Sequence, residues 1–171
     1  MTNSGNNHVL NSHSIAYGSG SEEQSVTGVP NSTNSKGYWL VESEQKQRNA
    51  KIPCSSKIKL KHVATNKYLT AIPNAQSPIS RNSELSCTSN SENAEYTIFE
   101  VVCLNPKASY WQRNDQVELK NVHSNEFVCA SKDHSFQHVI AGHIEVFAKS
   151  KPDSQCIWKV IEGAFPSENS S

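Results

Sequence analysis

Hydrophobic and polar residues alternate in short runs along most of the chain, without a convincing helical period. Around Ile58 and Leu60, for example, each hydrophobic residue stands between lysines, which is the two-residue period of a half-buried strand. Stretches rich in Ser and Asn separate these runs, and both residues favour turns over helix interiors. The pattern predicts an all-β chain of many short strands joined by polar loops.

A strand–turn–strand pattern occurs three times along the chain. The segment Leu60–Ala71 aligns with Leu119–Ala130, 59 residues further on (119 minus 60), and a weaker copy lies another 59 residues back, at Met1–Ser12. One turn position is an asparagine in every copy: Asn7, Asn66 and Asn125. Because Asn tolerates positive φ and bonds its own backbone, we predict a tight turn at each of these positions.

Two further runs recur in each copy. The first is a short alternating run, at Gln24–Val29, Ser83–Cys87 and His143–Ala148. The second contains a large aromatic residue, at Trp39, Phe99 and Trp158. An aromatic side chain at one place in each repeat suits a core with threefold symmetry. Four strands in each of three copies predict roughly twelve strands in a closed β-trefoil, an arrangement that leaves few strand edges exposed.

The repeat boundaries define one domain, which is what a chain of 171 residues is expected to form. We expect the β-trefoil to span residues 1–165, with repeats at about 1–46, 52–107 and 110–165, followed by a flexible tail at 166–171. The offset places the first strand of the first repeat before Met1. We therefore expect that strand to be missing, which would leave the barrel incomplete or its N-terminus frayed.

Charge and hydropathy argue against two classes of partner. The chain carries 16 Lys and Arg residues and 16 Asp and Glu residues, so no basic excess is present to hold a phosphate backbone, and we expect no nucleic-acid partner. No apolar run approaches the roughly 20 residues that cross a bilayer, so we predict no membrane span.

Neither end of the sequence shows a targeting signal. Residues 1–13 have no signal-peptide pattern, and residues 166–171 have no retrieval tetrapeptide. A closed trefoil with a polar surface is expected to be a monomer.

The five cysteines include no pair with CxxC spacing, so neither a zinc ribbon nor a thioredoxin-like site is predicted. Cys54 and Cys103 begin and end the second repeat. The first and fourth strands of a trefoil unit lie close together, so we predict a disulfide between these two residues. The other three are expected to be thiols in the core or in loops: Cys87, Cys129 and Cys156.

The segment Tyr17–Val29, which reads YGSGSEEQSVTGV, resembles the signature segment of the stromal cell-derived factor 2-like family. Residues similar to those of the family follow in the same order at Tyr38–Trp39, Ile58–Val63, Tyr110–Trp111 and Trp158–Gly163. The resemblance implies a β-trefoil of MIR repeats without catalytic activity. It also implies a place in the endoplasmic reticulum lumen or secretory pathway, with Hsp70 and J-protein chaperones as partners in protein folding and glycoprotein quality control.

The loop that begins at Tyr17 is the first candidate for a binding surface. Its two glycines allow a close backbone approach, its hydroxyl and amide groups offer hydrogen bonds, and its tyrosine offers an amphipathic ring. The candidate residues lie in this loop or beside it: Tyr17, Gly18, Ser19, Gly20, Ser21, Gln24 and His13. The alternative interpretation is a hairpin loop that needs glycine only for its turn.

Other chemistry has little support in the sequence. His134 and His138 have the HxxxH spacing but no third ligand nearby, so we expect neither a metal nor a cofactor. The chain contains no GxSxG, HExxH or phosphate-binding glycine loop, so we expect no enzyme. Asn31, in the sequon Asn31-Ser32-Thr33, is a candidate N-glycosylation site.

Two functions remain open at this point. The first is a protein-binding adaptor of the luminal chaperone system. The second is a glycan-binding trefoil that recognises O-mannosylated proteins. Many sugar-binding trefoils of the ricin type carry a QxW motif in each repeat, but the places before Trp39, Phe99 and Trp158 lack the Gln. The lectin interpretation is therefore the weaker alternative.

Overall fold

The computed structural model describes residues 1–30, 37–43, 51–89 and 93–161. The strands of the first copy are β1 (Thr2–Asn3), β2 (His8–Ala16), β3 (Gln24–Pro30) and β4 (Trp39–Ser43). The second copy contains β5 (Lys57–His62), β6 (Lys67–Gln76), β7 (Ser83–Thr88), the 3-10 turn η2 (Ala94–Thr97) and β8 (Phe99–Cys103). The third contains β9 (Val117–Asn121), β10 (Phe127–Ser135), β11 (Ile144–Lys149), η3 (Ser154–Cys156) and β12 (Trp158–Lys159). The all-β prediction is confirmed, while Asn31 and residues 166–171 lie outside the described ranges.

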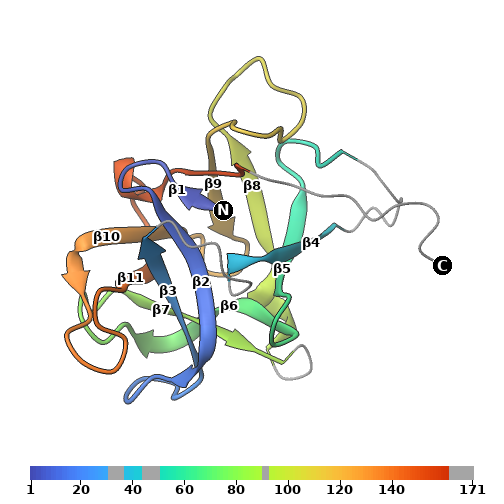
Figure 1. The fold of residues 1–171 in the computed structure, drawn as a ribbon. Helices are drawn as coiled ribbons and strands as arrows, with labels where there is room; N and C mark the ends of the chain where they lie inside the picture. The colour runs from blue at the N-terminus through green and yellow to red at the C-terminus, as the bar shows by residue number, and fades with distance from the viewer. Residues whose placement is uncertain (31–36, 44–50, 90–92, 162–171) are drawn as a thin grey trace.

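The strands form one sheet that closes on itself. It runs in the order β10-β11-β3-β2-β1-β12-β9-β8-β5-β6-β7, and a further pairing of β10 with β9 closes a ring. At one end, β3 pairs with β7, β7 with β11, and β11 with β3. Figure 1 shows these three strands side by side, with the loops of the three hairpins beyond them. Loops that lie far apart in the sequence are therefore neighbours at this end of the barrel.

The three long hairpins share one register. Leu10 lies opposite Gly28 in the first hairpin, as Leu69 lies opposite Cys87 in the second. In the third hairpin, Val128 lies opposite Ala148. In each hairpin the pairing register of the two strands shifts two or three residues after Leu10, Leu69 or Val128. Such an irregularity bends a strand pair, so each hairpin bends at the same place. Equivalent positions in the three copies can therefore be compared directly.

The first strand of the first copy, which the repeat offset placed before Met1, is present but short. β1 has two residues and pairs with both β12 and β2. It takes the place that β5 and β9, with six and five residues, hold in the other copies. β4 pairs with β5 over five residues, which joins the first copy to the second.

The recurring aromatic residues lie at one level of the barrel. Phe99 and Trp158 are fully buried, and Trp39 packs against the same core while half-buried. The Trp39 Nε1–H donates to the Leu10 carbonyl at 3.0 Å, and the Trp158 Nε1–H donates to the Val128 carbonyl at 2.9 Å. Leu10 and Val128 are equivalent residues, so the two tryptophans hold their hairpins by the same bond. The inward position expected for all three aromatics is confirmed.

The three repeated asparagines are all in turns with positive φ. Their φ angles are 59° at Asn7, 56° at Asn66 and 58° at Asn125, in the left-handed region that Asn tolerates better than most residues. Each backbone N–H donates to the carbonyl four residues earlier, at 2.8 to 2.9 Å. The prediction of a tight turn at each position is confirmed, and the same bond recurs in all three copies.

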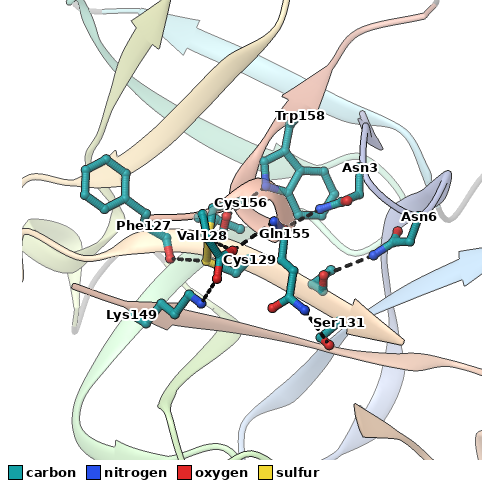
Figure 2. Close-up of a disulfide and its surroundings, with 12 residues drawn as sticks. Asn3, Asn6, Phe127, Val128, Cys129, Ser131, Lys149, Gln155, Cys156 and Trp158 are labelled. Carbon is teal, nitrogen blue, oxygen red and sulfur yellow. Dashed lines mark hydrogen bonds and ion pairs between the residues drawn. A yellow bond between two sulfur atoms is a disulfide. The ribbon is translucent and has the colours of Figure 1, made fainter. Parts of the chain in front are cut away.

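Two disulfides link segments that are distant in sequence. One joins Cys54 to Cys103, with a Cα–Cα distance of 5.6 Å. The other joins Cys129 on β10 to Cys156 in η3, with a Cα–Cα distance of 4.0 Å (Figure 2). The prediction that Cys129 and Cys156 are thiols is therefore wrong, because closure of the third copy brings η3 beside β10. Cys87 is free and buried, and its burial raises the pKa of the thiol to about 12.

Candidate functional site

The structure places Tyr17 inside the protein, with 5% of its surface exposed. Its hydroxyl lies 3.0 Å from the carbonyl oxygens of Val26 and Leu85, and it accepts the Val26 N–H at 3.2 Å. Burial raises the pKa of the phenol above its usual value. The expectation that this ring is available at the surface is wrong, because the hydroxyl bonds two neighbouring hairpins together instead.

Gln24 and His13 are buried as well, with 7% and 5% of their surfaces exposed. The Gln24 Nε2 donates to Ser12 Oγ at 2.8 Å and to Thr65 Oγ1 at 3.0 Å, so it connects β3 to the turn of the second copy. The His13 ring meets His143 edge to face, with 5.3 Å between ring centroids. Neither of these two candidate side chains is therefore presented at the surface.

Three candidate residues of the loop remain exposed: Gly18, Ser19 and Gly20. Ser21 is half-buried, because its N–H and hydroxyl both donate to the carboxylate of Glu84 on β7. Gly20 has a φ of 67°, and a Cβ there would collide with the same carboxylate. Glycine is thus required at this position by the turn and by its neighbour, which favours the structural interpretation of the loop.

Replacing Tyr17 with phenylalanine is expected to lower the free energy of unfolding by about 1 to 2 kcal/mol, because buried backbone groups of β3 and β7 lose a hydrogen-bond partner. Urea denaturation measures the change. The matched control is Tyr38→Phe, because Tyr38 is 55% exposed and its variant should unfold like the parent. Equal stability of Tyr17→Phe and the parent would show that the hydroxyl contributes nothing to the fold.

Buried carboxylates hold two of the three hairpin loops. Glu145, on β11, is fully buried and accepts the N–H groups of Ile79 and Ser80 at 2.7 and 3.0 Å. Glu84, on β7, binds the loop of the first hairpin in the equivalent way. The strand pairings place Ser25 at the corresponding position on β3. The third loop, residues 136–143, therefore faces a serine where the other two loops meet a carboxylate.

An open groove of about 1030 Å³ lies beside the second hairpin. The end of β6 and its loop contribute Asn74, Arg81 and Asn82 to its lining. Tyr96 of η2 lines it as well, with His123 and Glu126 of the β9–β10 turn. Ser19 and Gly20 reach one edge, so two of the residues expected from the sequence border this groove.

The groove contains groups suited to binding a polar ligand. The rings of Tyr96 and His123 meet edge to face with centroids 4.5 Å apart. Ser83 Oγ donates to the Glu126 carboxylate at 2.9 Å, which fixes that carboxylate in the wall. The negative charge of Glu95 raises the pKa of Tyr96 above its usual value. The groove thus offers an aromatic surface, a carboxylate and hydrogen-bond donors.

Lys149 adds a positive charge at the far edge of the groove. Its ammonium is paired with Asp153, and the hydrogen bond from Lys149 lowers the pKa of the Asp153 carboxyl. Arg81 lines the groove too and is exposed. With Glu126 in the same lining, the groove has both signs of charge.

The main groove residues carry no signal in the sequence. Tyr96 and His123 each stand alone in a short connection. Their contact arises because η2 and the β9–β10 turn lie side by side. No spacing within either segment carries that information.

Within residues 1–30, 37–43, 51–89 and 93–161, no group of three or more His, Cys, Asp or Glu side chains is arranged to hold a metal ion. His134, one of the two histidines in the HxxxH pattern, lies edge to face against Phe147 instead. None of the helices among the described residues has the length and apolar character needed to span a bilayer.

Comparison with known proteins gives a consistent family assignment. The MIR domain family matches residues 8–152. Human stromal cell-derived factor 2 is 33% identical over 98% of this chain and 80% of the human protein. The crystal structure of the SDF2-like protein from Arabidopsis thaliana superposes with a TM-score of 0.90 at 26% identity, over 99% of this chain and 94% of that one.

A designed protein with threefold symmetry shares the fold. It superposes with a TM-score of 0.61 at 11% identity, over 94% of this chain and 95% of the designed one. At this identity the likeness concerns the architecture alone.

Proposed function

Because this chain belongs to the MIR-domain family of stromal cell-derived factor 2 and its relatives, we propose that it is a non-catalytic binding module of the endoplasmic reticulum lumen. It acts there as an adaptor of a chaperone complex, with luminal Hsp70 and J-proteins as partners, in protein folding and glycoprotein quality control. The observation that carries this proposal is the similarity to stromal cell-derived factor 2 over 98% of the chain.

The proposed architecture is one β-trefoil of three MIR repeats, at about 1–46, 52–107 and 110–165, within a single domain of residues 1–165. The shared register of the three hairpins and the mutual pairing of β3, β7 and β11 support it. Residues 166–171 would form the tail, and the protein would act as a monomer. One rigid domain suits an adaptor, since its binding surfaces keep fixed positions relative to one another.

The two disulfides support a place in the secretory pathway. Disulfides persist in oxidising compartments such as the endoplasmic reticulum and are rare in the cytosol. The links Cys54–Cys103 and Cys129–Cys156 involve four of the five cysteines of the chain. Such a protein is expected to reach its stable form in the lumen.

The groove beside the second hairpin is the proposed contact surface for the partner. Its rings, carboxylate and cations can meet both polar and charged groups. Aromatic side chains that are only partly covered are frequent anchors of protein interfaces. Tyr96 and His123 are the residues expected to contribute most.

The test is affinity capture from a secretory-pathway lysate with the full chain as bait, followed by mass spectrometry. We expect Hsp70 and J-protein chaperones to be retained, and we expect the double variant Tyr96→Ala, His123→Ala to retain at least tenfold less. The matched control Tyr38→Ala removes an exposed aromatic from another surface and should retain the parent amount. Absence of chaperones from the parent capture would refute the adaptor role, and equal retention by the double variant would refute the groove as its contact.

Glycan binding is the second candidate function. The observation that favours it is the pair of rings in the groove beside a fixed carboxylate and Asn82, since sugars stack on rings and bond to carboxylates and amides. In the same capture experiment, O-mannosylated proteins would be retained and free methyl α-mannoside would elute them. That elution would favour the lectin role over the adaptor role.

A further inference from the structure

The third hairpin loop differs from the other two in what holds it. Glu84 and Glu145 bind the first and second loops through backbone N–H groups, whereas Ser25 occupies the equivalent place for the third. The Ser25 hydroxyl donates to the Ile15 carbonyl at 2.6 Å within its own hairpin. At this position the third loop, residues 136–143, therefore meets a serine instead of a buried glutamate.

Histidines gather at the third hairpin. Of the seven histidines in the chain, three lie on this hairpin or in its loop, and a fourth packs against it: His134, His138, His143 and His13. His138 is exposed, and His134 is half-buried beside Phe147. Histidine is the side chain whose charge changes between about pH 5 and about pH 8. This end of the barrel therefore gains positive charge in mild acid.

Two of these histidines join the third loop to the first hairpin. His13, on β2, is buried, and its ring meets that of His143 edge to face with 5.3 Å between ring centroids. His143 is half-buried, and its Nδ1 lies 2.9 Å from Thr27 Oγ1 on β3. The pair thus connects the end of the third loop to both strands of the first hairpin.

The described surroundings of the two rings carry little charge. Both rings line a pocket of about 420 Å³ between β2 and the third loop, and the rest of its lining is uncharged: Asn11, Ser14, Ile15, Val29, Val139, Ile140 and Ala141. Glu145 follows His143 by two residues on β11, but its carboxylate accepts the N–H groups of the second loop. Lys132 and Asp133, on β10, are both exposed. A proton on either ring therefore places a charge in largely uncharged surroundings.

The burial of these rings gives the pH dependence its sign. Burial disfavours the charged form of an imidazole. The closed loop, with both rings packed, therefore binds fewer protons than an open loop in which both rings are in water. Opening is favoured as the pH falls below the ordinary histidine pKa of about 6.5, and closure is favoured above it. Two imidazolium rings at the observed separation would also repel each other.

We propose that His13 and His143 form a pH switch that holds the third loop against β2 at neutral pH and releases it in mild acid. At neutral pH the ring contact and the bond to Thr27 keep the loop closed. In acid both rings take up protons and move into water, and the loop separates from the first hairpin. The switch shares no lining residue with the groove of Tyr96, so it does not depend on the partner proposed for that groove.

Hydrogen exchange of the full chain, followed by NMR at about pH 7.5 and about pH 5, tests the switch. The Phe136 N–H bonds to the His143 carbonyl and the His143 N–H to the Ile140 carbonyl, so these two amides report on closure. Their protection factors, which correct for the intrinsic pH dependence of exchange, should fall by about tenfold at the lower pH. The Ser77 amide, in a second loop without histidine, should keep its protection. Equal or higher protection of Phe136 and His143 in acid would overturn the proposal.

Variants that cannot take up a proton locate the switch. His13→Phe keeps an aromatic ring in the buried position, and His143→Gln keeps a hydrogen-bonding group beside Thr27. Each should reduce the fall in protection, and the two together should abolish it. The matched control His138→Gln removes an exposed histidine of the same loop and should respond like the parent. A parent-like fall in both single variants or in the combined one, or loss of the response in His138→Gln, would overturn the assignment to this pair.

Discussion

Replacing Cys54 and Cys103 together with serine is expected to lower the free energy of unfolding by about 4 kcal/mol. The two cysteines are separated by 49 residues, and the disulfide restricts the unfolded chain by closing that long loop. The loss of loop-closure entropy in the unfolded state scales with the logarithm of loop length and gives about 4 kcal/mol for this separation. Urea denaturation monitored by tryptophan fluorescence measures the change.

The second disulfide provides a comparison for this effect. Cys129 and Cys156 are separated by 27 residues, so loop entropy alone predicts a loss of about 3.5 kcal/mol when both become serine. Both residues are fully buried, however, and serine would bury two hydroxyls in their place, which adds to the loss.

The outcome that would contradict the first prediction concerns the Cys54→Ser, Cys103→Ser protein. A change in its free energy of unfolding below about 1 kcal/mol would contradict a stabilising role for the Cys54–Cys103 disulfide.

Replacing Glu145 with alanine is expected to lower the free energy of unfolding by about 2 to 4 kcal/mol. The carboxylate is fully buried and accepts the N–H groups of the half-buried residues Ile79 and Ser80, so its removal leaves a cavity and takes the partner from both donors. A donor that loses its hydrogen bond away from water costs about 1 to 3 kcal/mol, and partial exposure keeps each of these two near the lower end. Urea denaturation measures the total, and hydrogen exchange of the Ile79 and Ser80 amides should become faster.

Two variants separate this bond from general effects of losing a glutamate. Glu145→Gln keeps one acceptor oxygen and should lose about half as much stability as the alanine variant. Glu95→Ala removes an exposed glutamate and should change stability by less than about 0.5 kcal/mol. Similar losses from Glu145→Ala and Glu95→Ala would show that the buried carboxylate does not hold the second loop.

Much of the fold could be predicted because its signals are local or repeat at a fixed offset. The alternation around Ile58 and Leu60 predicted β5, whose residues are alternately buried and half-buried in the structure. The repeated asparagine predicted the turn at Asn66, because φ tolerance is a property of that residue type. The constant spacing also placed Trp158 at the same level of the core as Phe99.

The candidate site was less predictable, because exposure depends on which segments meet. The Tyr17 loop has the composition of a binding surface, yet the Tyr17 hydroxyl lies between the Val26 and Leu85 carbonyls of two different hairpins. The Cys129–Cys156 link also depends on the third copy folding back on itself. Neither position has a sequence pattern that distinguishes it from an exposed tyrosine or a free thiol.

The sequence by itself determined that this protein is all-β, that a strand–turn–strand pattern recurs three times along it, and where its repeated tight turns lie. Alternation, turn preference and a fixed offset are properties of neighbouring or regularly spaced residues, so they can be read along the chain. Only the tertiary structure decided which side chains are buried, which carboxylates hold loops, and where the groove of Tyr96 forms. Those features arise where strands and loops from different copies come together as the sheet closes, and their contacts cross long stretches of sequence.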